Sequence, residues 1–249
     1  MITDRLQAGK LLGRRLRARF GTRIGRDDIV VLGIPRGGVP VAARVAAELG
    51  APLDAVIVRK LGAPFRPEVS IGAIGEGGVR VVNNGLMRSM GVSDGDLRAV
   101  ELREGLELDR AASRLLGHGE RTYLQGKTAV IVDDGVATGV TARAACAIAR
   151  RAGAAHVVLA VPAAPAEWQD WMTGAADEYL ALETVDNVLA ISRLCDEFGQ
   201  TSDDEVVALL RASHLAVDDL DEDVEIDVGS VQLHGHLAVP SGHSGIVIF

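Results

Sequence analysis

Residues 130–141 read VIVDDGVATGVT, and this stretch decides the fold class of the 249-residue chain. A run of apolar residues, typical of a buried strand, is followed by two adjacent acids and then by a loop of small residues that opens a helix. Open parallel α/β sheets bind their ligands at the carboxyl ends of such strands, beside helix N-termini. The stretch therefore predicts both the sheet and the position of a functional site.

The rest of the chain alternates strand-length apolar runs with helical patterns, as in a parallel sheet. Strands are expected at Ile29–Ile34, Leu53–Arg59, Thr128–Asp133, His156–Val161 and Glu178–Leu182. Helices are expected at Asp4–Phe20, Val39–Leu49 and Thr138–Ala152, and after the capping-box residues Ser93 and Ser202. About seventy residues separate the second strand from the third, too many for a simple crossover, so we expect a hood or lid inserted at the edge of the site.

Composition narrows the class of protein. Apolar residues make up 48% of the chain and mean hydropathy is +0.20, but no apolar run approaches the roughly 18 residues of a membrane span. The start of the chain lacks a secretory signal, and two cysteines, Cys146 and Cys195, cannot form a disulfide framework. We therefore expect a soluble, cytoplasmic protein with no membrane partner.

Charge is concentrated in one segment. The net charge is −8, and seven of the 34 acids lie within residues 218–227, which contain no base. The remaining 27 acids nearly balance the 26 lysines and arginines, so the body does not repel a phosphate. With only 3% aromatic residues and no basic stripe, nucleic acid is not expected as a partner.

The acid pair and the loop after it suggest a phosphorylated sugar as ligand. Asp133 and Asp134 are placed to accept hydrogen bonds from sugar hydroxyls, while the loop offers backbone N–H groups and hydroxyls to a phosphate on the same sugar. The expected phosphate-binding residues are Gly135, Val136, Ala137, Thr138, Gly139 and Thr141. A solvated acid pair before an ordinary glycine turn is the alternative, but it leaves the threonines unexplained. The chain has neither a P-loop nor a dinucleotide-binding glycine motif.

A second loop, GIPRGG at residues 33–38, follows the first strand. Its glycines allow close backbone approach and its arginine can bond an anion through two N–H groups, which suits a diphosphate. An ordinary turn could have the same sequence. Lys60 ends the second apolar run and is a further candidate for phosphate binding.

The two loops together resemble the site motifs of the type I phosphoribosyltransferases, over about residues 1–215, and residues 68–78 are similar to a bacterial subgroup of predicted members. The resemblance implies a parallel-sheet core with a hood. It also implies that phosphoribosyl pyrophosphate, bound with Mg²⁺, gives its 5-phosphoribosyl group to a nitrogen acceptor such as a nucleobase and releases pyrophosphate.

Residue roles follow from the same resemblance. Asp133 and Asp134 would hold the ribose hydroxyls, residues 135–141 the 5-phosphate, and Lys60 the pyrophosphate. The pyrophosphate loop would comprise Pro35, Arg36, Gly37 and Gly38, with a non-proline cis peptide. Catalytic roles are expected for Asp133, Asp134, Arg36 and Lys60. Mg²⁺ would be held mainly by substrate and water, without a protein metal site, and a homodimer is compatible with the family.

The lid is where the chain departs from that pattern. In the subgroup a basic loop precedes the acid-pair strand, but here residues 116–123 place Glu120 between His118 and Arg121. Arg121 is the candidate lid residue for the leaving group, and His118 is expected in a solvated loop. The altered lid keeps a second hypothesis open, a non-catalytic regulatory protein that binds a nucleotide or phosphoribosyl pyrophosphate.

The C-terminal part differs in pattern from the body. We expect the first domain to end near residue 215, an acidic linker at 216–227, and a β-rich appendage at 228–249 that begins with a hairpin turning at Gly229 and Ser230. The hairpin and the final Ile246–Phe249 run resemble the opening of an α/β-hydrolase domain of the dienelactone hydrolase kind. No G-x-S-x-G nucleophile elbow follows, so ester hydrolysis by this chain is not expected.

Overall fold

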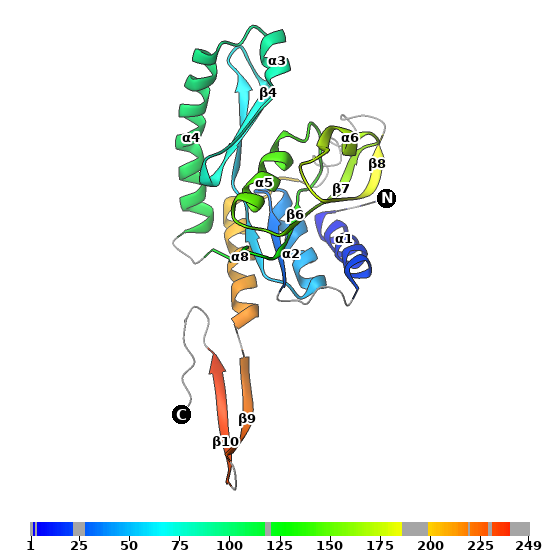
Figure 1. Cartoon of the computed structure of the whole chain (residues 1–249), viewed down its shortest axis with the longest axis vertical. Coiled ribbons are helices and arrows are strands. Elements are labelled where there is room, and N and C mark those ends of the chain that lie inside the picture. Colours follow the sequence, from blue (N-terminus) through cyan, green and yellow to red (C-terminus); the bar gives the residue numbers. More distant parts are fainter. Residues whose placement is uncertain are drawn as a thin grey trace.

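A five-stranded parallel sheet with strand order β2-β1-β6-β7-β8 forms the centre of the molecule (Figure 1). The structure is a computed structural model that describes residues 2, 4–21, 28–117, 121–185, 199–218, 220–228 and 231–239. The strands are β1 (Ile29–Gly33), β2 (Leu53–Ala55), β6 (Thr128–Val132), β7 (His156–Pro165) and β8 (Glu178–Val185). The predicted α/β class with a parallel core is therefore confirmed.

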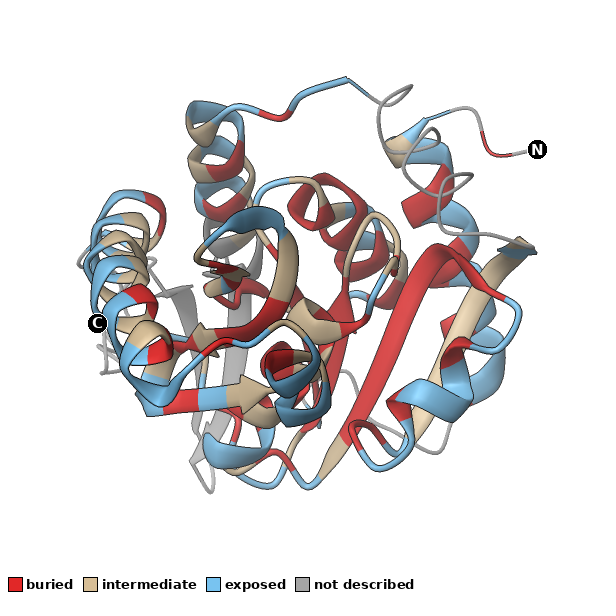
Figure 2. Cartoon of the chain, turned by 90° about the horizontal axis from the view of Figure 1, so that it is seen from above, coloured by how far each residue is buried: buried red, intermediate tan, exposed pale blue. Residues whose placement is uncertain are grey.

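Helices cover both faces of this sheet, which explains why its central strands are apolar throughout. Val31 and the other residues of one face pack against α1 (Arg5–Phe20), α2 (Gly38–Leu49) and α8 (Asp203–Asp218). Val30 and its neighbours on the other face pack against α5 (Val140–Arg151) and α6 (Trp168–Met172). Figure 2 shows the buried residues gathered in the strands and on the inner sides of the helices.

The predicted hood forms a second layer with an apolar core of its own, and Ala73 and Val79 of its strands also pack in the core of the parallel sheet. Its antiparallel sheet has the order β3-β4-β5, formed by β3 (Val58–Ala63), β4 (Arg66–Gly75) and β5 (Val79–Val82). A 3₁₀ turn, η2 (Glu76–Gly78), links β4 to β5, and α3 (Asn84–Ser89) and α4 (Asp94–Leu116) complete the layer. Figure 1 shows α4 running the length of the hood beside β4. The hood core comprises Leu61, Ala63, Ile71, Met87, Val92, Leu97 and Val100.

The apolar run expected as one strand at Leu53–Arg59 forms two strands in different sheets, so that prediction is wrong. Val56 N still donates to Gly33 O of the parallel sheet at 3.0 Å. Ile57 N donates instead to the Glu76 carboxylate at 2.9 Å. Glu76, the first residue of η2, thus takes the place of a strand partner at the point where the chain leaves the parallel sheet.

Capping residues fix where two helices begin. The capping box expected at Ser93 is complete, because Asp96 N donates to Ser93 Oγ at 3.1 Å and Ser93 N donates to Asp96 Oδ2 at 3.0 Å. At the start of α8, Glu205 N donates to Ser202 Oγ at 3.1 Å. These caps set the positions of α4 and of Asp203, the first residue of α8.

The expected C-terminal hairpin is present. Strand β9 (Leu220–Val228) pairs antiparallel with β10 (Val231–Val239), and Figure 1 shows the pair beyond the end of α8, away from the parallel sheet. Because β9 begins at Leu220, most of the stretch expected as an acidic linker is strand. The expected turn at Gly229 and Ser230 and the Ile246–Phe249 run lie outside the described residues.

Within the part of the chain that the structure covers, none of the helices has the length and apolarity needed to cross a membrane.

Candidate functional site

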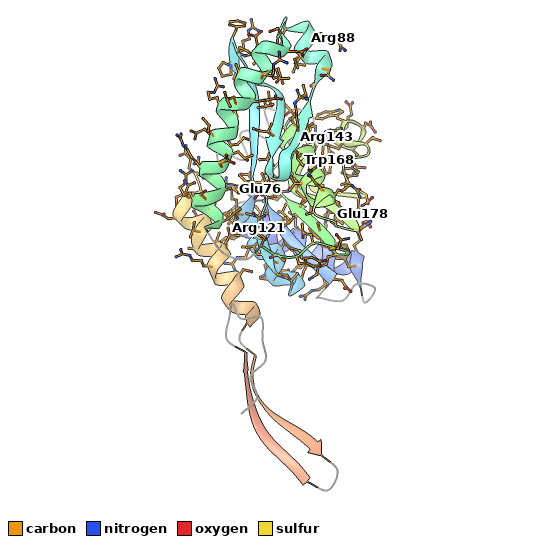
Figure 3. The ribbon with its side chains drawn as sticks, turned by 60° about the vertical axis from the view of Figure 1, so that its left-hand side comes forward. Glu76, Arg88, Arg121, Arg143, Trp168 and Glu178 are labelled. Atoms are coloured by element: carbon orange, nitrogen blue, oxygen red, sulfur yellow. The ribbon has the colours of Figure 1, made fainter. Side chains whose placement is uncertain are left out.

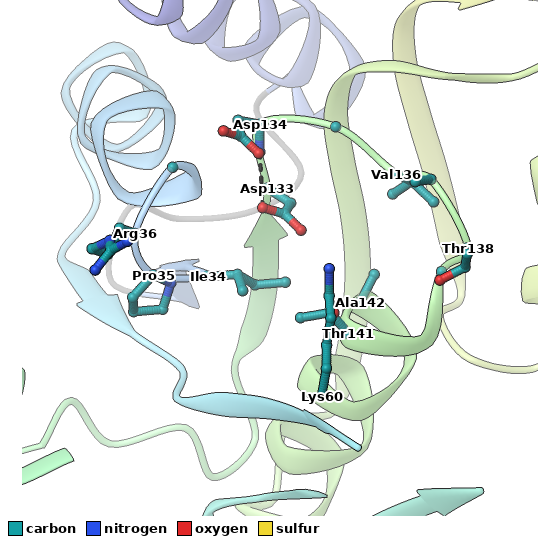
Figure 4. Close-up of a pocket in the computed structure, with 14 residues that line it drawn as sticks. Ile34, Pro35, Arg36, Lys60, Asp133, Asp134, Val136, Thr138, Thr141 and Ala142 are labelled. Atoms are coloured by element: carbon teal, nitrogen blue, oxygen red, sulfur yellow. Dashed lines mark hydrogen bonds between the residues drawn. The ribbon is translucent and has the colours of Figure 1, made fainter. Parts of the chain in front are cut away.

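A cavity of about 380 Å³ opens at the carboxyl end of the parallel sheet (Figure 4). It is lined by residues 34–37 after β1, by Lys60 of β3, and by residues 133–139 after β6 together with Thr141 and Ala142 of α5. Both loops singled out in the sequence thus line one cavity, with Lys60 as the contribution of the hood.

Strand register explains why the two loops meet. Gly33, the last residue of β1, pairs with Val132, the last residue of β6, so both strands end level. Ile34 N then donates to Val132 O at 2.9 Å, which ties the start of one loop to the end of the neighbouring strand. The Pro35–Arg36 peptide is cis, as the resemblance implied.

Glycine is required at positions 37 and 38 because the first loop passes very close to the acid pair there. A Cβ atom at residue 37 would lie 1.9 Å from Asp134 Oδ2, and one at residue 38 would lie 2.6 Å from Val132 O and 2.9 Å from Asp133 Cα. No side chain fits at such distances, so only glycine lets the first loop pass directly against the second.

The two acids have different surroundings. Asp133 faces the cavity and the amine of Lys60 in Figure 4, and its Oδ1 accepts a hydrogen bond from Asp134 N at 2.9 Å. The protein around Asp133 raises its pKa well above the ordinary carboxyl value, first through burial and second through the negative charge of Asp134, while Lys60 acts in the opposite direction. Asp133 therefore holds a proton more readily than an ordinary aspartate.

Asp134 is paired with a residue that sequence reasoning missed. Arg5 Nη2 lies 2.7 Å from Asp134 Oδ2, and both side chains are largely buried. No sequence signal links these residues, which lie 129 positions apart.

The loop after the acids is anchored and leads into a helix N-terminus. Val136 is buried, and its N–H donates to Ala163 O of β7 at 3.1 Å. Gly139 adopts a left-handed conformation with φ of 74° as the N-cap of α5. Thr138 and Thr141 both line the cavity, so hydroxyls and the positive end of the helix dipole face the same space, as an anion site requires.

Arg36 and Lys60 bring positive charge to the cavity. The Arg36 side chain is 56% exposed, and its Nη1 lies 3.7 Å from Asp203 Oδ1. Among the described residues that line the cavity, Arg36 and Lys60 are the cations.

Arg121, the candidate lid residue, does not line this cavity, so the structure does not bring it to the predicted position. Its Nε lies 3.1 Å from Asp54 Oδ2, its Nη1 lies 2.7 Å from Glu76 Oε1, and its Nη2 donates to Ala55 O at 2.7 Å. Figure 3 shows Arg121 beside Glu76. Two carboxylates hold this guanidinium at the junction of sheet and hood. His118 lies outside the described residues.

The described residues contain no group of three or more His, Cys, Asp or Glu side chains placed to hold a metal. The two carboxylates at the cavity are nevertheless oxygen donors of the kind that a largely hydrated Mg²⁺ accepts beside substrate phosphates. These carboxylates would be the protein's donors to a Mg²⁺ ion bound together with a phosphorylated ligand.

Comparison with known proteins agrees with this geometry. A family model described as "Phosphoribosyl transferase domain" matches residues 1–175. Two Mycobacterium tuberculosis proteins, from strains H37Rv and CDC 1551 and provisionally named as phosphoribosyl transferases, are each 46% identical over 261 residues. The alignments cover all of this chain but only 58% of each relative, so the chain spans little more than half their length.

A solved structure shows a similar fold. The protein in the crystal structure of TT1426 from Thermus thermophilus is 38% identical in sequence to this chain, and the two structures superpose with a TM-score of 0.68. The match covers 84% of this chain and 97% of the TT1426 chain. The family match over residues 1–175, the similarity to this structure and the shared cavity of two loops lead to one conclusion: the chain belongs to the type I phosphoribosyltransferase family.

Proposed function

We propose that this protein transfers the 5-phosphoribosyl group of phosphoribosyl pyrophosphate, bound with Mg²⁺, to a ring nitrogen of a nucleobase-like acceptor, with release of pyrophosphate. The observation that carries the proposal is the shared cavity. Figure 4 shows the acid pair between the arginine loop on one side and Thr138 at the N-terminus of α5 on the other, with Lys60 facing the pair. A ligand with a sugar diol between two phosphate groups matches that arrangement.

Each end of the ligand has a place in the cavity. The 5-phosphate would bind at the N-terminus of α5 beside Thr138 and Thr141. The ribose hydroxyls would donate hydrogen bonds to the carboxylates of the acid pair. The pyrophosphate would lie against residues 34–37, with Arg36 and Lys60 as counter-charges.

The reaction needs charge stabilisation and no covalent nucleophile. The bond between the anomeric carbon and the pyrophosphate oxygen breaks, its electron pair leaves with pyrophosphate, the acceptor nitrogen bonds to the carbon, and the acceptor's proton is lost to solvent. Arg36 and Lys60 would stabilise the charge that grows on the leaving group, and the acid pair the positive charge that grows on the sugar ring. Bound Mg²⁺ would supply further neutralisation of the pyrophosphate.

Two measurements test the proposal. Calorimetric titration of the full chain with phosphoribosyl pyrophosphate, with and without Mg²⁺, should show binding that Mg²⁺ strengthens. A panel of purine and pyrimidine bases should then give pyrophosphate release with at least one member. No binding of phosphoribosyl pyrophosphate by the folded chain would refute the function.

The position of Arg121 favours a second candidate, the non-catalytic regulatory protein. Asp54 and Glu76 hold this guanidinium away from the cavity. Among the described residues that line the cavity, the cations available to a leaving group are therefore those of Arg36 and Lys60. A chain that binds phosphoribosyl pyrophosphate with Mg²⁺ but releases no pyrophosphate with any base would support this candidate over the enzyme.

A further inference from the structure

Arg5 reaches the acid pair from the first turn of α1. Its Nη2 lies 2.7 Å and its Nε 3.3 Å from Asp134 Oδ2, and its Nη1 donates to Gly199 O at 2.8 Å. The Arg5 and Asp134 side chains are 11% and 18% exposed. A guanidinium with all three nitrogens engaged and so little exposure is a fixed part of the site, unlike a solvated surface arginine.

The location of Arg5 works against the stability of its own helix. A cation in the first turn opposes the helix dipole, whose N-terminal end is already positive. Helix α1 has its cap in Asp4, which accepts a hydrogen bond from Gln7 N at 2.7 Å, and its buried Leu12 and Leu16 belong to the same core as α2. Packing and capping thus hold the helix in place, and the carboxylate of Asp134 compensates the unfavourable charge at position 5.

The ion pair also fills the space beside the loop at residues 34–37. A Cβ atom at Gly37 would lie 1.9 Å from Asp134 Oδ2 and 3.1 Å from Arg5 Nη2. The loop assigned to pyrophosphate therefore packs directly on the Arg5–Asp134 pair, so a shift of either side chain would be felt by that loop.

We propose that Arg5 is a positioning residue, which holds the Asp134 carboxylate in a fixed orientation for the sugar hydroxyls and leaves Asp133 as the carboxyl that faces Lys60. This inference rests on the proposed function. Two neighbouring carboxylates repel each other, and a cation held on one of them stabilises the charge there.

The test compares Arg5→Ala and Arg5→Lys with a control, Arg19→Ala. Arg19 lies on the same helix as Arg5, and its replacement removes an ion pair with Glu178 of β8. Affinity for phosphoribosyl pyrophosphate with Mg²⁺ is measured by calorimetry at neutral pH. Arg5→Ala should lose about ten- to hundredfold in affinity, as expected for a charged hydrogen-bond partner.

The other variants separate positioning from general stability. Arg5→Lys keeps the charge but not the three-nitrogen geometry, so it should recover part of the affinity. Arg19→Ala should bind as the wild type does. Wild-type affinity in a folded Arg5→Ala chain, or an equal loss in Arg19→Ala, would overturn the inference.

A measurement without ligand keeps the inference distinct from the proposed function. Carboxyl-carbon NMR of the ligand-free chain at neutral pH should show the Asp134 signal move in Arg5→Ala, or in Arg5→Gln if the alanine variant does not fold, and stay in place in Arg19→Ala. An unmoved Asp134 signal in the Arg5 variant would refute the role of Arg5. Failure of the wild type to bind phosphoribosyl pyrophosphate would instead refute the proposed function and leave the NMR result standing.

Discussion

Arg36 lies 3.7 Å from Asp203, so the cation of the loop assigned to pyrophosphate already has a carboxylate beside it. Asp203 begins α8 and also forms an ion pair with Arg114 of α4 at 2.6 Å. One side chain therefore connects the cavity, the hood and the last helix. A diphosphate that binds Arg36 has to share that arginine with Asp203 or displace it.

Asp203→Asn is expected to tighten pyrophosphate binding, because it removes the anion that competes for Arg36. The gain should be about two- to fivefold, since exposed ion pairs contribute roughly 0–1 kcal/mol. Calorimetry with pyrophosphate and Mg²⁺ measures it. Asp204→Asn changes the net charge equally at the adjacent, exposed position and serves as control. Equal gains in both variants would mean that net charge alone, and not the contact with Arg36, sets the affinity.

Arg36→Ala should weaken pyrophosphate more than it weakens ribose 5-phosphate, because residues 34–37 are assigned to the leaving group. Thr138→Ala should show the reverse preference, since Thr138 lines the opposite end of the cavity. A loss of about tenfold or more is expected for the charged contact. Titration of each variant with both ligands gives the comparison. Identical losses for the two ligands would show that the loops have been assigned to the wrong ends.

Replacing both acids, Asp133→Asn with Asp134→Asn, should abolish productive binding of phosphoribosyl pyrophosphate. Each lost charged partner is expected to cost on the order of 1.5–3 kcal/mol. Calorimetry measures the affinity, and circular dichroism checks that the double variant is folded. Unchanged affinity would contradict the assignment of the ribose site to this pair.

Asp133→Asn alone should stabilise the fold at neutral pH. The pKa of Asp133 is raised in the folded protein, first by burial, so the stability that its proton contributes is present at low pH and is lost as the pH rises. Asparagine carries no charge at any pH and avoids this loss. Thermal denaturation should give a higher Tm for the variant at neutral pH, with the difference vanishing in acid.

Asp134→Asn provides the contrast, because it leaves the largely buried Arg5 without its carboxylate and should lower Tm. A neutral-pH Tm for Asp133→Asn at or below that of the wild type would argue against the raised pKa of Asp133.

Removal of residues 219–249 should leave affinity for phosphoribosyl pyrophosphate within about twofold of the full chain. Helix α8 stays complete, and the strand pairing of the deleted β9 and β10 is with each other. Calorimetry and thermal denaturation of the shortened chain test this. Loss of folding, or of binding by a folded product, would show that the hairpin is integral to the first domain.

The sequence predicted the acid pair and its loop because everything that defines them is local. Strand, acids, glycines and threonines follow one another within residues 130–141, and the same holds for residues 33–38. The end of a parallel strand is also the place where such side chains must gather, so the order of residues along the chain was enough to expect both loops in one cavity.

What the sequence could not show depends on contacts between distant residues. The run at 53–59 is uniformly suited to a strand. The change of sheet within it is marked by Glu76, which accepts a hydrogen bond from Ile57 N, nineteen positions earlier in the chain. Arg5 was missed for the same reason, since nothing near it in the chain distinguishes it from the other arginines of α1. The ion pairs of Arg121 could not be expected either, because its two carboxylate partners come from β2 and η2, and its role as a lid residue stays a prediction.

Lys60 belongs to β3 of the hood, whereas Asp133 follows β6 of the parallel sheet, so the facing charges of the cavity come from two layers of the molecule. These layers share apolar packing, because Ala73 of β4 belongs to the same core as Ile131 of β6 and Ile148 of α5. The hood is then more than a cover, because its packing against α5 sets where the Lys60 cation stands relative to the acid pair. A hood exchanged between relatives would bring its own cation, but it would also have to match the apolar surface of α5 to place that cation correctly.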